Sequence, residues 1–168
     1  DRYENATSDE NSGNSLTTIT IDNNATAAYF FFKGTGLELI SRTNATDSGK
    51  LALRIYNASD VDANGNILNS AKPIKDIPVI TEFDHNDDGG SEAIYQVPVI
   101  RVNDLPLDEN GQAKQYAVLI SGVPTRDYTQ TGADGKPRVI PTNLYIDGLR
   151  IYQPGEGNAD IENNYDAD

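Results

Sequence analysis

The segment DVDANGN, residues 60–66, places oxygen-bearing side chains at alternate positions around a glycine. The side chains are those of Asp60, Asp62, Asn64 and Asn66. Calcium prefers carboxylate and amide oxygens, and a helix-loop-helix calcium loop begins with this spacing. Such a loop also needs a bidentate glutamate at its twelfth position, where this chain has Ala71. We therefore expect any calcium bound here to be structural, with a dissociation constant of about 10⁻⁴ to 10⁻³ M, and to stiffen the loop.

The same residues have a second interpretation as a connection between strands. Asn64-Gly65 is a dipeptide that adopts the positive φ angles of a tight turn, and no helical pattern flanks the segment. The acidic stretch DHNDDGG, residues 84–90, begins like a calcium loop too, but Tyr95 occupies its twelfth position. Both the metal and the turn interpretations stay open for these loops.

Nucleophilic catalysis needs a base beside the nucleophile, and the only histidine is His85. His85 lies among aspartates that favour its charged form, which is a poor base at neutral pH. The chain has no cysteine, and none of the patterns G-x-S-x-G, H-E-x-x-H or the phosphate-binding P-loop occurs in it. We therefore expect that the protein is not an enzyme.

Binding of a saccharide needs an aromatic ring that stacks on the sugar, with polar side chains beside it for the hydroxyls. There is no tryptophan, so a tyrosine or a phenylalanine must supply the ring. Tyr128 lies in the polar stretch PTRDYTQTGADGKPR, flanked by Arg126, Asp127 and Gln130, and these four residues are our first candidate for a carbohydrate site. Phe83 and His85 are the second candidate. The alternative for Tyr128 is a ring that folds back over a sheet edge.

These residues must be positioned by strands, because β-branched and aromatic residues at alternate positions dominate every ordered-looking segment. The predicted strands are 16–21, 27–33, 36–41, 50–56, 77–83, 93–102, 115–121 and 143–152. This number of short strands predicts an all-β fold, a two-sheet antiparallel β-sandwich or jelly roll. Pro78 and Pro98 lack the donor of an inner strand, so we expect their strands to be peripheral or bulged.

The formal charge of −13 is concentrated toward the chain ends. Residues 154–168 carry five acids and no base, and residues 1–15 are also acidic and polar. We expect both segments to be flexible linkers around a single module at residues 16–153, a monomeric unit of a larger chain. The absence of a basic stripe argues against a nucleic-acid partner, and the absence of a long apolar run argues against insertion into a membrane.

The segments YFFFKGTGLELISRTNATDSGKLALRIYN and NLYIDGLRIYQP resemble the galactose-binding-domain-like jelly rolls. The chain is similar to modules of surface and secreted proteins of Gram-positive anaerobes, including carbohydrate-binding modules. This resemblance implies an extracellular or cell-surface location, and it implies that Asp147 holds a structural calcium ion near the first strand. The alternative is that Asp147 and Gly148 form a bulge or turn. The chain departs from the family in lacking tryptophan, and no arginine-lined sugar pocket is matched by spacing.

Two functions are compatible with these observations. The first is a non-catalytic module of an extracellular bacterial protein that binds a polysaccharide such as a glucan. The second is a structural or adhesion module that spaces other domains and has no sugar site.

Overall fold

The computed structural model describes residues 3–6, 16–23, 25–43, 50–81 and 94–154. The strands within them are β1 (Tyr3–Ala6), β2 (Leu16–Ile21), β3 (Thr26–Gly34), β4 (Gly36–Thr43), β5 (Lys50–Asn57), β6 (Lys75–Thr81), β7 (Ile94–Val102), β8 (Lys114–Val123), β9 (Thr125–Thr131), β10 (Pro137–Ile140), β11 (Thr142–Ile146) and β12 (Gly148–Tyr152). The described residues also include the short 3-10 helix η2 (Ala58–Asp60), and among them we find no helix with the length and apolar character to cross a membrane.

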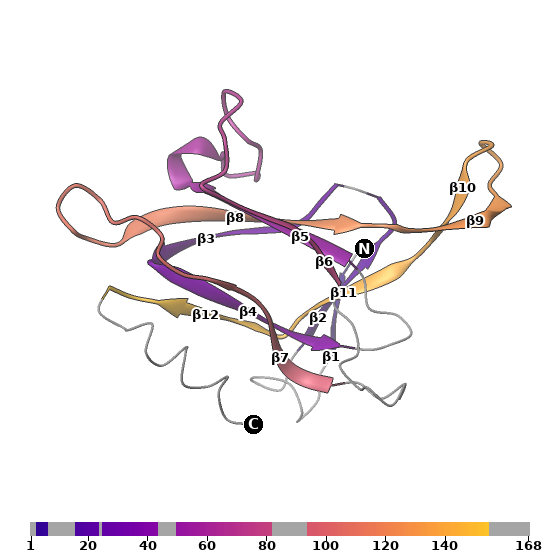
Figure 1. Ribbon diagram of the computed structural model, residues 1–168, viewed down its shortest axis with the longest axis horizontal. Coiled ribbons are helices and arrows are strands. Elements are labelled where there is room, and N and C mark those ends of the chain that lie inside the picture. Colours follow the sequence, from indigo (N-terminus) through magenta and orange to yellow (C-terminus); the bar gives the residue numbers. More distant parts are fainter. Residues whose placement is uncertain (1–2, 7–15, 24, 44–49, 82–93, 155–168) are drawn as a thin grey trace.

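The described strands pair only in the antiparallel sense and form several sheets. Their orders are β3-β8-β5-β6, β12-β4-β7, β1-β2-β11 and β10-β9. In Figure 1 the strands β3, β5 and β8 lie in one layer, and β4, β7 and β12 lie in a layer that faces it. The chain is therefore mostly β and has a sandwich-like architecture.

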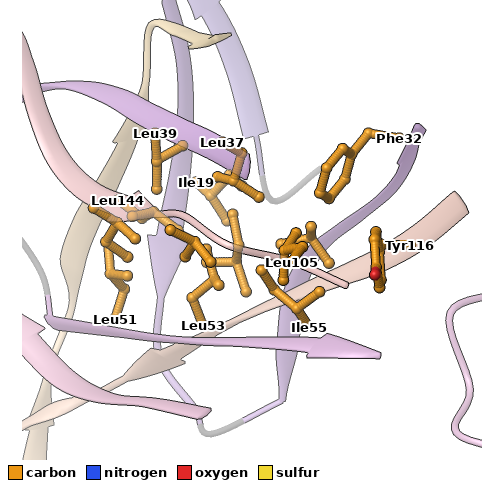
Figure 2. Close-up of a cluster of buried hydrophobic side chains, with 14 of the residues drawn as sticks. Ile19, Phe32, Leu37, Leu39, Leu51, Leu53, Ile55, Leu105, Tyr116 and Leu144 are labelled. Carbon is orange, nitrogen blue, oxygen red and sulfur yellow. The ribbon is translucent and has the colours of Figure 1, made fainter. Parts of the chain in front are cut away.

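An apolar core fills the space between the facing layers. Alternate residues of β5 point inward, and Leu51, Leu53 and Ile55 have no solvent-exposed surface. Leu37 and Leu39 of β4 meet them from the opposite side (Figure 2). Full burial of each such side chain contributes about 1.5–3 kcal/mol to folding, so this layer is the main source of stability.

Strand β8 is buried on both of its faces. Its residues Val118 and Ile120 belong to the main core, whereas Ala117 and Leu119 belong to a second cluster on the outer face. Residues 58–71 cover that outer face, and Val61 packs there. A strand buried on both faces is apolar without alternation, which explains the continuous run AVLI in this segment.

The structure corrects three of the predicted boundaries. Residues 3–6, expected to belong to a flexible linker, form β1, which pairs with β2. The polar stretch around Tyr128, expected to be a loop, forms the hairpin β9–β10. The last predicted strand, 143–152, is divided at Asp147, because β11 pairs with β2 whereas β12 pairs with β4.

The expectation for the two strand prolines is confirmed. Pro78 lies in β6, an edge strand, where the pairing with β5 changes register between Leu51 and Leu53. Pro98 lies in β7, also an edge strand, where the pairing with β4 changes register between Leu39 and Ile40. Proline cannot donate a backbone hydrogen bond. At an edge strand or a bulge no neighbouring carbonyl depends on that donor, so proline is tolerated there.

Two glycines with the same backbone conformation test how tightly the 58–71 segment packs on the sheet. Gly65 has φ +81° and Gly111 has φ +73°, but a Cβ on Gly65 would lie 2.6 Å from the Tyr29 ring, whereas one on Gly111 would meet nothing within 4 Å. We expect Gly111→Ala to destabilise the fold by about 1–2 kcal/mol through backbone strain alone. Gly65→Ala should cost at least about 1 kcal/mol more because of the collision. Urea unfolding of both variants measures the difference, and equal losses would contradict the packing of Tyr29 under this segment.

Candidate functional site

The hairpin β9–β10 stands out from one end of the molecule (Figure 1). It links β8, in the four-stranded sheet, to β11, in the sheet that contains β2. Pro124 and Pro141 occupy the two junctions between the hairpin and the body of the fold. Because proline has no N–H to donate, both junctions interrupt the ladders that would otherwise continue into the hairpin.

Tyr128 lies in a wide bulge of this hairpin. Thr131 pairs with Pro137 and Asp127 pairs with Arg138, so the register of the two strands shifts here and Tyr128 lies within the shifted stretch of β9. A bulge of this kind turns side chains out of the sheet and is frequent beside binding sites. The Tyr128 side chain is 81% exposed, the highest exposure among the large hydrophobic residues that the structure describes. The alternative of a ring folded back over a sheet edge does not fit this exposure.

Exposed polar side chains lie two residues before and two residues after Tyr128 in β9. Arg126 and Gln130 are both exposed, and the Arg138 Nη1 donates a hydrogen bond of 2.8 Å to the Gln130 Oε1. Asp127 lies in the same strand, whereas Phe83 and His85 lie outside the described residues. The hairpin therefore carries an exposed aromatic ring, guanidinium donors and an amide on neighbouring positions.

The predicted calcium loop at residues 60–66 is a hydrogen-bonded turn. The Asp62 Oδ1 accepts the backbone N–H groups of Asn64 and Asn66, at 2.8 and 2.9 Å, and its Oδ2 accepts the Asn66 Nδ2 at 3.0 Å. Gly65 supplies a positive φ, but Asn64 does not, so only half of the predicted Asn-Gly geometry is present. The turn interpretation of this segment is thus confirmed, and Asp62 stabilises it.

The same turn occurs at residues 108–112, where the Asp108 Oδ1 accepts the N–H groups of Asn110 and Gln112, at 2.9 and 2.8 Å. Both turns also share two backbone hydrogen bonds, one from the aspartate N–H and one from the glycine N–H. An aspartate that caps its own turn explains the spacing of the acidic and amide side chains without a cation.

The remaining predicted calcium ligands are separated in the fold. The Asp60 Oδ2 accepts a hydrogen bond of 3.2 Å from the Asn57 Nδ2, on the outer side of the four-stranded sheet. Asp147 is 9% exposed and lies where the chain passes from β11 to β12, with its N–H donating to the Ile40 carbonyl at 2.9 Å. Within the described ranges no three acidic, histidine or cysteine side chains are grouped to hold a metal ion. A structural calcium ion therefore stays a prediction.

A polar cluster that the sequence did not predict lies on the outward face of the β12-β4-β7 sheet. Its centre is Glu38, only 2% exposed, between the inward-pointing Leu37 and Leu39 of β4. The Glu38 Oε1 accepts hydrogen bonds from the Arg101 Nε and Nη2, at 3.0 and 2.7 Å.

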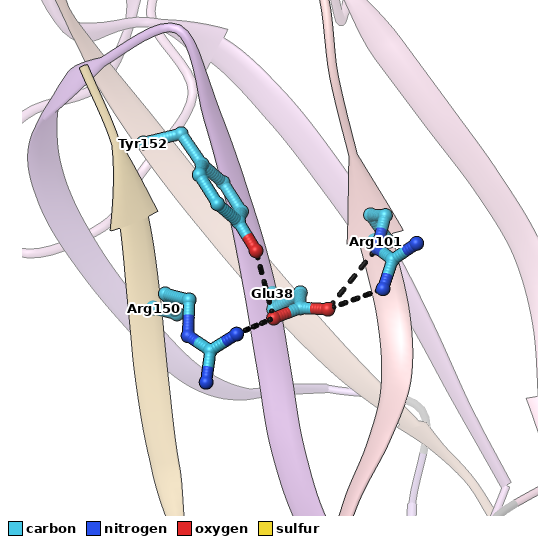
Figure 3. A network of polar contacts seen from close by, with 4 residues as sticks. All are labelled: Glu38, Arg101, Arg150 and Tyr152. Atoms are coloured by element: carbon cyan, nitrogen blue, oxygen red, sulfur yellow. Dashed lines mark hydrogen bonds and ion pairs between the residues drawn. The ribbon is translucent and has the colours of Figure 1, made fainter. Parts of the chain in front are cut away.

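The other oxygen of the same carboxylate has two further partners. The Glu38 Oε2 accepts a hydrogen bond of 3.0 Å from the Tyr152 hydroxyl and lies 3.2 Å from the Arg150 Nη1 (Figure 3). Desolvation, together with the bond to Glu38, raises the pKa of Tyr152 above 10.0. The hydroxyl therefore stays protonated and donates a hydrogen bond to Glu38. Each carboxylate oxygen thus has two donors, and we name these four residues the Glu38 cluster.

Cross-strand register assembles the Glu38 cluster. Glu38 pairs with Arg101 of β7 on one side and with Arg150 of β12 on the other. The only sequence signal was a charged residue in the middle of each apolar run, in LEL, VIRV and GLRIY. Strand order across 114 residues of chain cannot be derived from that signal, so the sequence analysis missed this cluster.

A comparison with protein-family models finds no match to the chain, and a comparison with curated protein sequences finds none. The resemblance to galactose-binding-domain-like modules therefore stays a prediction.

The Asp62 turn predicts a measurable acid sensitivity. Hydrogen bonds from the Asn66 side chain and from the Asn66 and Asn64 N–H groups lower the pKa of Asp62 below its ordinary value of 3.8. A depressed folded-state pKa means that the carboxylate contributes stability above that ordinary value and loses it as pH falls through the folded-state pKa. An NMR titration of the carboxyl carbons should give Asp62 a pKa below 3.8. The excess stability of wild type over Asp62→Asn should shrink in acid, and a titration at or above 3.8 would contradict the turn.

The burial of Glu38 predicts that removal of its carboxylate costs more folding stability than removal of one partner of an exposed ion pair. Glu38→Ala removes a buried carboxylate that has four donors, but the arginines left behind keep access to solvent, so we expect it to destabilise the fold by about 2–3 kcal/mol. Asp76→Ala removes the partner of Arg54 in a pair whose side chains are 54% and 51% exposed, and should cost about 0–1 kcal/mol. Chemical unfolding of the two variants checks this contrast, and similar losses would show that Glu38 does not hold the three strands together.

Proposed function

We propose that this chain is a non-catalytic carbohydrate-binding module of an extracellular or cell-surface protein, with a polysaccharide such as a glucan as its ligand. The observation that carries the proposal is the exposed ring of Tyr128 in the bulge of β9. An 81% exposed tyrosine on a projecting hairpin has no packing role in the fold. It provides a flat apolar face on which a pyranose ring stacks.

The neighbours of Tyr128 supply the second half of a saccharide site. Sugar hydroxyls both donate and accept, so they need acceptors and donors within reach of the stacking ring. The Gln130 amide and the Arg126 guanidinium provide these groups, and the bond from Arg138 restrains Gln130 before any ligand arrives. Such restraint reduces the entropy lost on binding and supports recognition at this hairpin.

The proposal includes a specific fold, a two-sheet jelly roll. It requires β1-β2-β11 and β12-β4-β7 to act as one layer, facing β3-β8-β5-β6. Two contacts support this requirement: the Asp147 N–H donates to the Ile40 carbonyl, and the Ser41 hydroxyl donates to the Tyr145 carbonyl at 2.8 Å. They join the end of β11 to β4 where the two sheets meet.

The rival function is a structural or adhesion module that contacts a protein partner and has no sugar site. A separate observation favours it, because Tyr29, Phe31, Ile67 and Leu68 are 43%, 37%, 42% and 39% exposed. Tyr29 and Phe31 lie on one face of β3, and Tyr29 contacts the 58–71 segment, which contains Ile67 and Leu68. Apolar side chains gathered on one face are typical of protein contacts. In this function Tyr128 would bind no saccharide.

Retention on insoluble polysaccharide separates the two functions. We expect wild type to be retained by at least one neutral glucan in an affinity-gel panel, and Tyr128→Ala to lose that retention because stacking of one ring contributes about 0.5–1.5 kcal/mol beyond the area it buries. Tyr128→Phe is the matched control, since it keeps the ring and should keep most of the retention. No retention of wild type across the panel, or unchanged retention of Tyr128→Ala, would favour the rival.

A further inference from the structure

Two guanidinium groups converge on one carboxylate in the Glu38 cluster. Glu38 is bonded to both Arg101 and Arg150, and the two arginines lie on the strands on either side of it.

Counting donors and acceptors identifies the kind of ligand. A carboxylate has about four acceptor positions, and Glu38 receives Arg101 Nε and Nη2, Tyr152 Oη and Arg150 Nη1. Its acceptor capacity is filled, whereas a guanidinium has five N–H groups and Arg150 has two partners, the Glu38 carboxylate and the Tyr152 side chain. A ligand at this place must therefore accept hydrogen bonds, and an anionic acceptor forms the stronger, charge-assisted bond with a guanidinium.

Arg150 is the group that a ligand can reach. Its side chain is 59% exposed, against 23% for Arg101 and 2% for Glu38. Glu38 and the half-buried Tyr152 fix the guanidinium from below, and all of these residues lie on paired strands rather than on loops. A donor fork held on strands loses little entropy on binding, and its planar geometry matches a carboxylate.

We propose that the outward face of the β12-β4-β7 sheet binds the carboxylate of an acidic saccharide, a uronic acid residue, with Arg150 as the contacting group and Glu38, Arg101 and Tyr152 as positioning residues. This inference rests on the proposed saccharide-binding function, but it uses a face of the molecule different from the Tyr128 hairpin. The half-buried Tyr152 ring beside Arg150 offers an apolar surface for the pyranose that carries the acid (Figure 3).

The test measures the affinity of the intact chain for polygalacturonate at about 0.15 M salt, where the Debye length is about 8 Å and repulsion by the distant acidic residues is screened. Fully methyl-esterified polygalacturonate is the probe that keeps the backbone and removes the charge. We expect binding to the acid form and binding at least tenfold weaker to the ester. Equal binding to the two probes, or no binding to the acid, would overturn the inference.

Variants locate the site. Arg150→Gln should weaken binding to polygalacturonate about tenfold, the loss of one charge-assisted contact. Arg54→Gln makes the same change of charge in an exposed pair on the β3-β8-β5-β6 sheet and should bind like wild type. Arg150→Lys is a second variant, for the case in which Arg150→Gln does not fold. It keeps the positive charge beside Glu38 but loses the planar guanidinium fork. It should therefore fold and still bind more weakly than wild type. Equal effects of the Arg150 and Arg54 changes, or wild-type affinity in Arg150→Lys, would refute a site at Arg150.

The two proposals fail in different ways. Tyr128→Ala should lose neutral glucan and keep polygalacturonate, and Arg150→Gln should do the opposite. If wild type binds polygalacturonate but no neutral glucan, the Tyr128 site is refuted and the Arg150 site stands. If Tyr128→Ala abolishes binding to both polymers, the acid is bound at the hairpin and the inference about Arg150 is wrong.

Discussion

The exclusion of water from the layer between the facing sheets determines what the remaining residues can do. Leu39, Leu53 and Val118 lose all or nearly all of their exposed surface there, and their burial offsets the conformational entropy lost by the strands. Inward positions must therefore be apolar, and recognition is restricted to outward faces, turns and the hairpin that leaves the body of the fold. Strand β8, with both faces buried, is the most constrained element among those described.

The outward polar groups then divide into two kinds. Some are consumed by the structure itself: Asp62 and Asp108 cap their own turns, and Glu38 receives four donors. Others keep donors or an apolar face exposed, as Arg150 and Tyr128 do. The acidic residues that first attract attention in the sequence belong to the first kind, whereas both proposed binding groups belong to the second.

The sequence predicted most of the strands because period-two alternation records which face of a strand is buried. The prediction failed for the hairpin around Tyr128, because its residues are polar on both sides and an exposed ribbon leaves no apolar alternation to detect. It failed for the Glu38 cluster for another reason. Which strand lies beside β4 is decided by tertiary packing, and a charged residue in an apolar run does not identify its cross-strand partner.

In the proposed function, one apolar core supports two separate saccharide-binding surfaces. Backbone amide chemical shifts of the isotope-labelled chain, followed during titration with a neutral and then an acidic oligosaccharide, test it most directly. The neutral sugar should shift the signals of residues 125–131 and 137–140, and the acidic sugar those of residues 36–40, 99–102 and 148–152. Shifts confined to the outer face near Tyr29 and Phe31, or no shifts with either sugar, would contradict it.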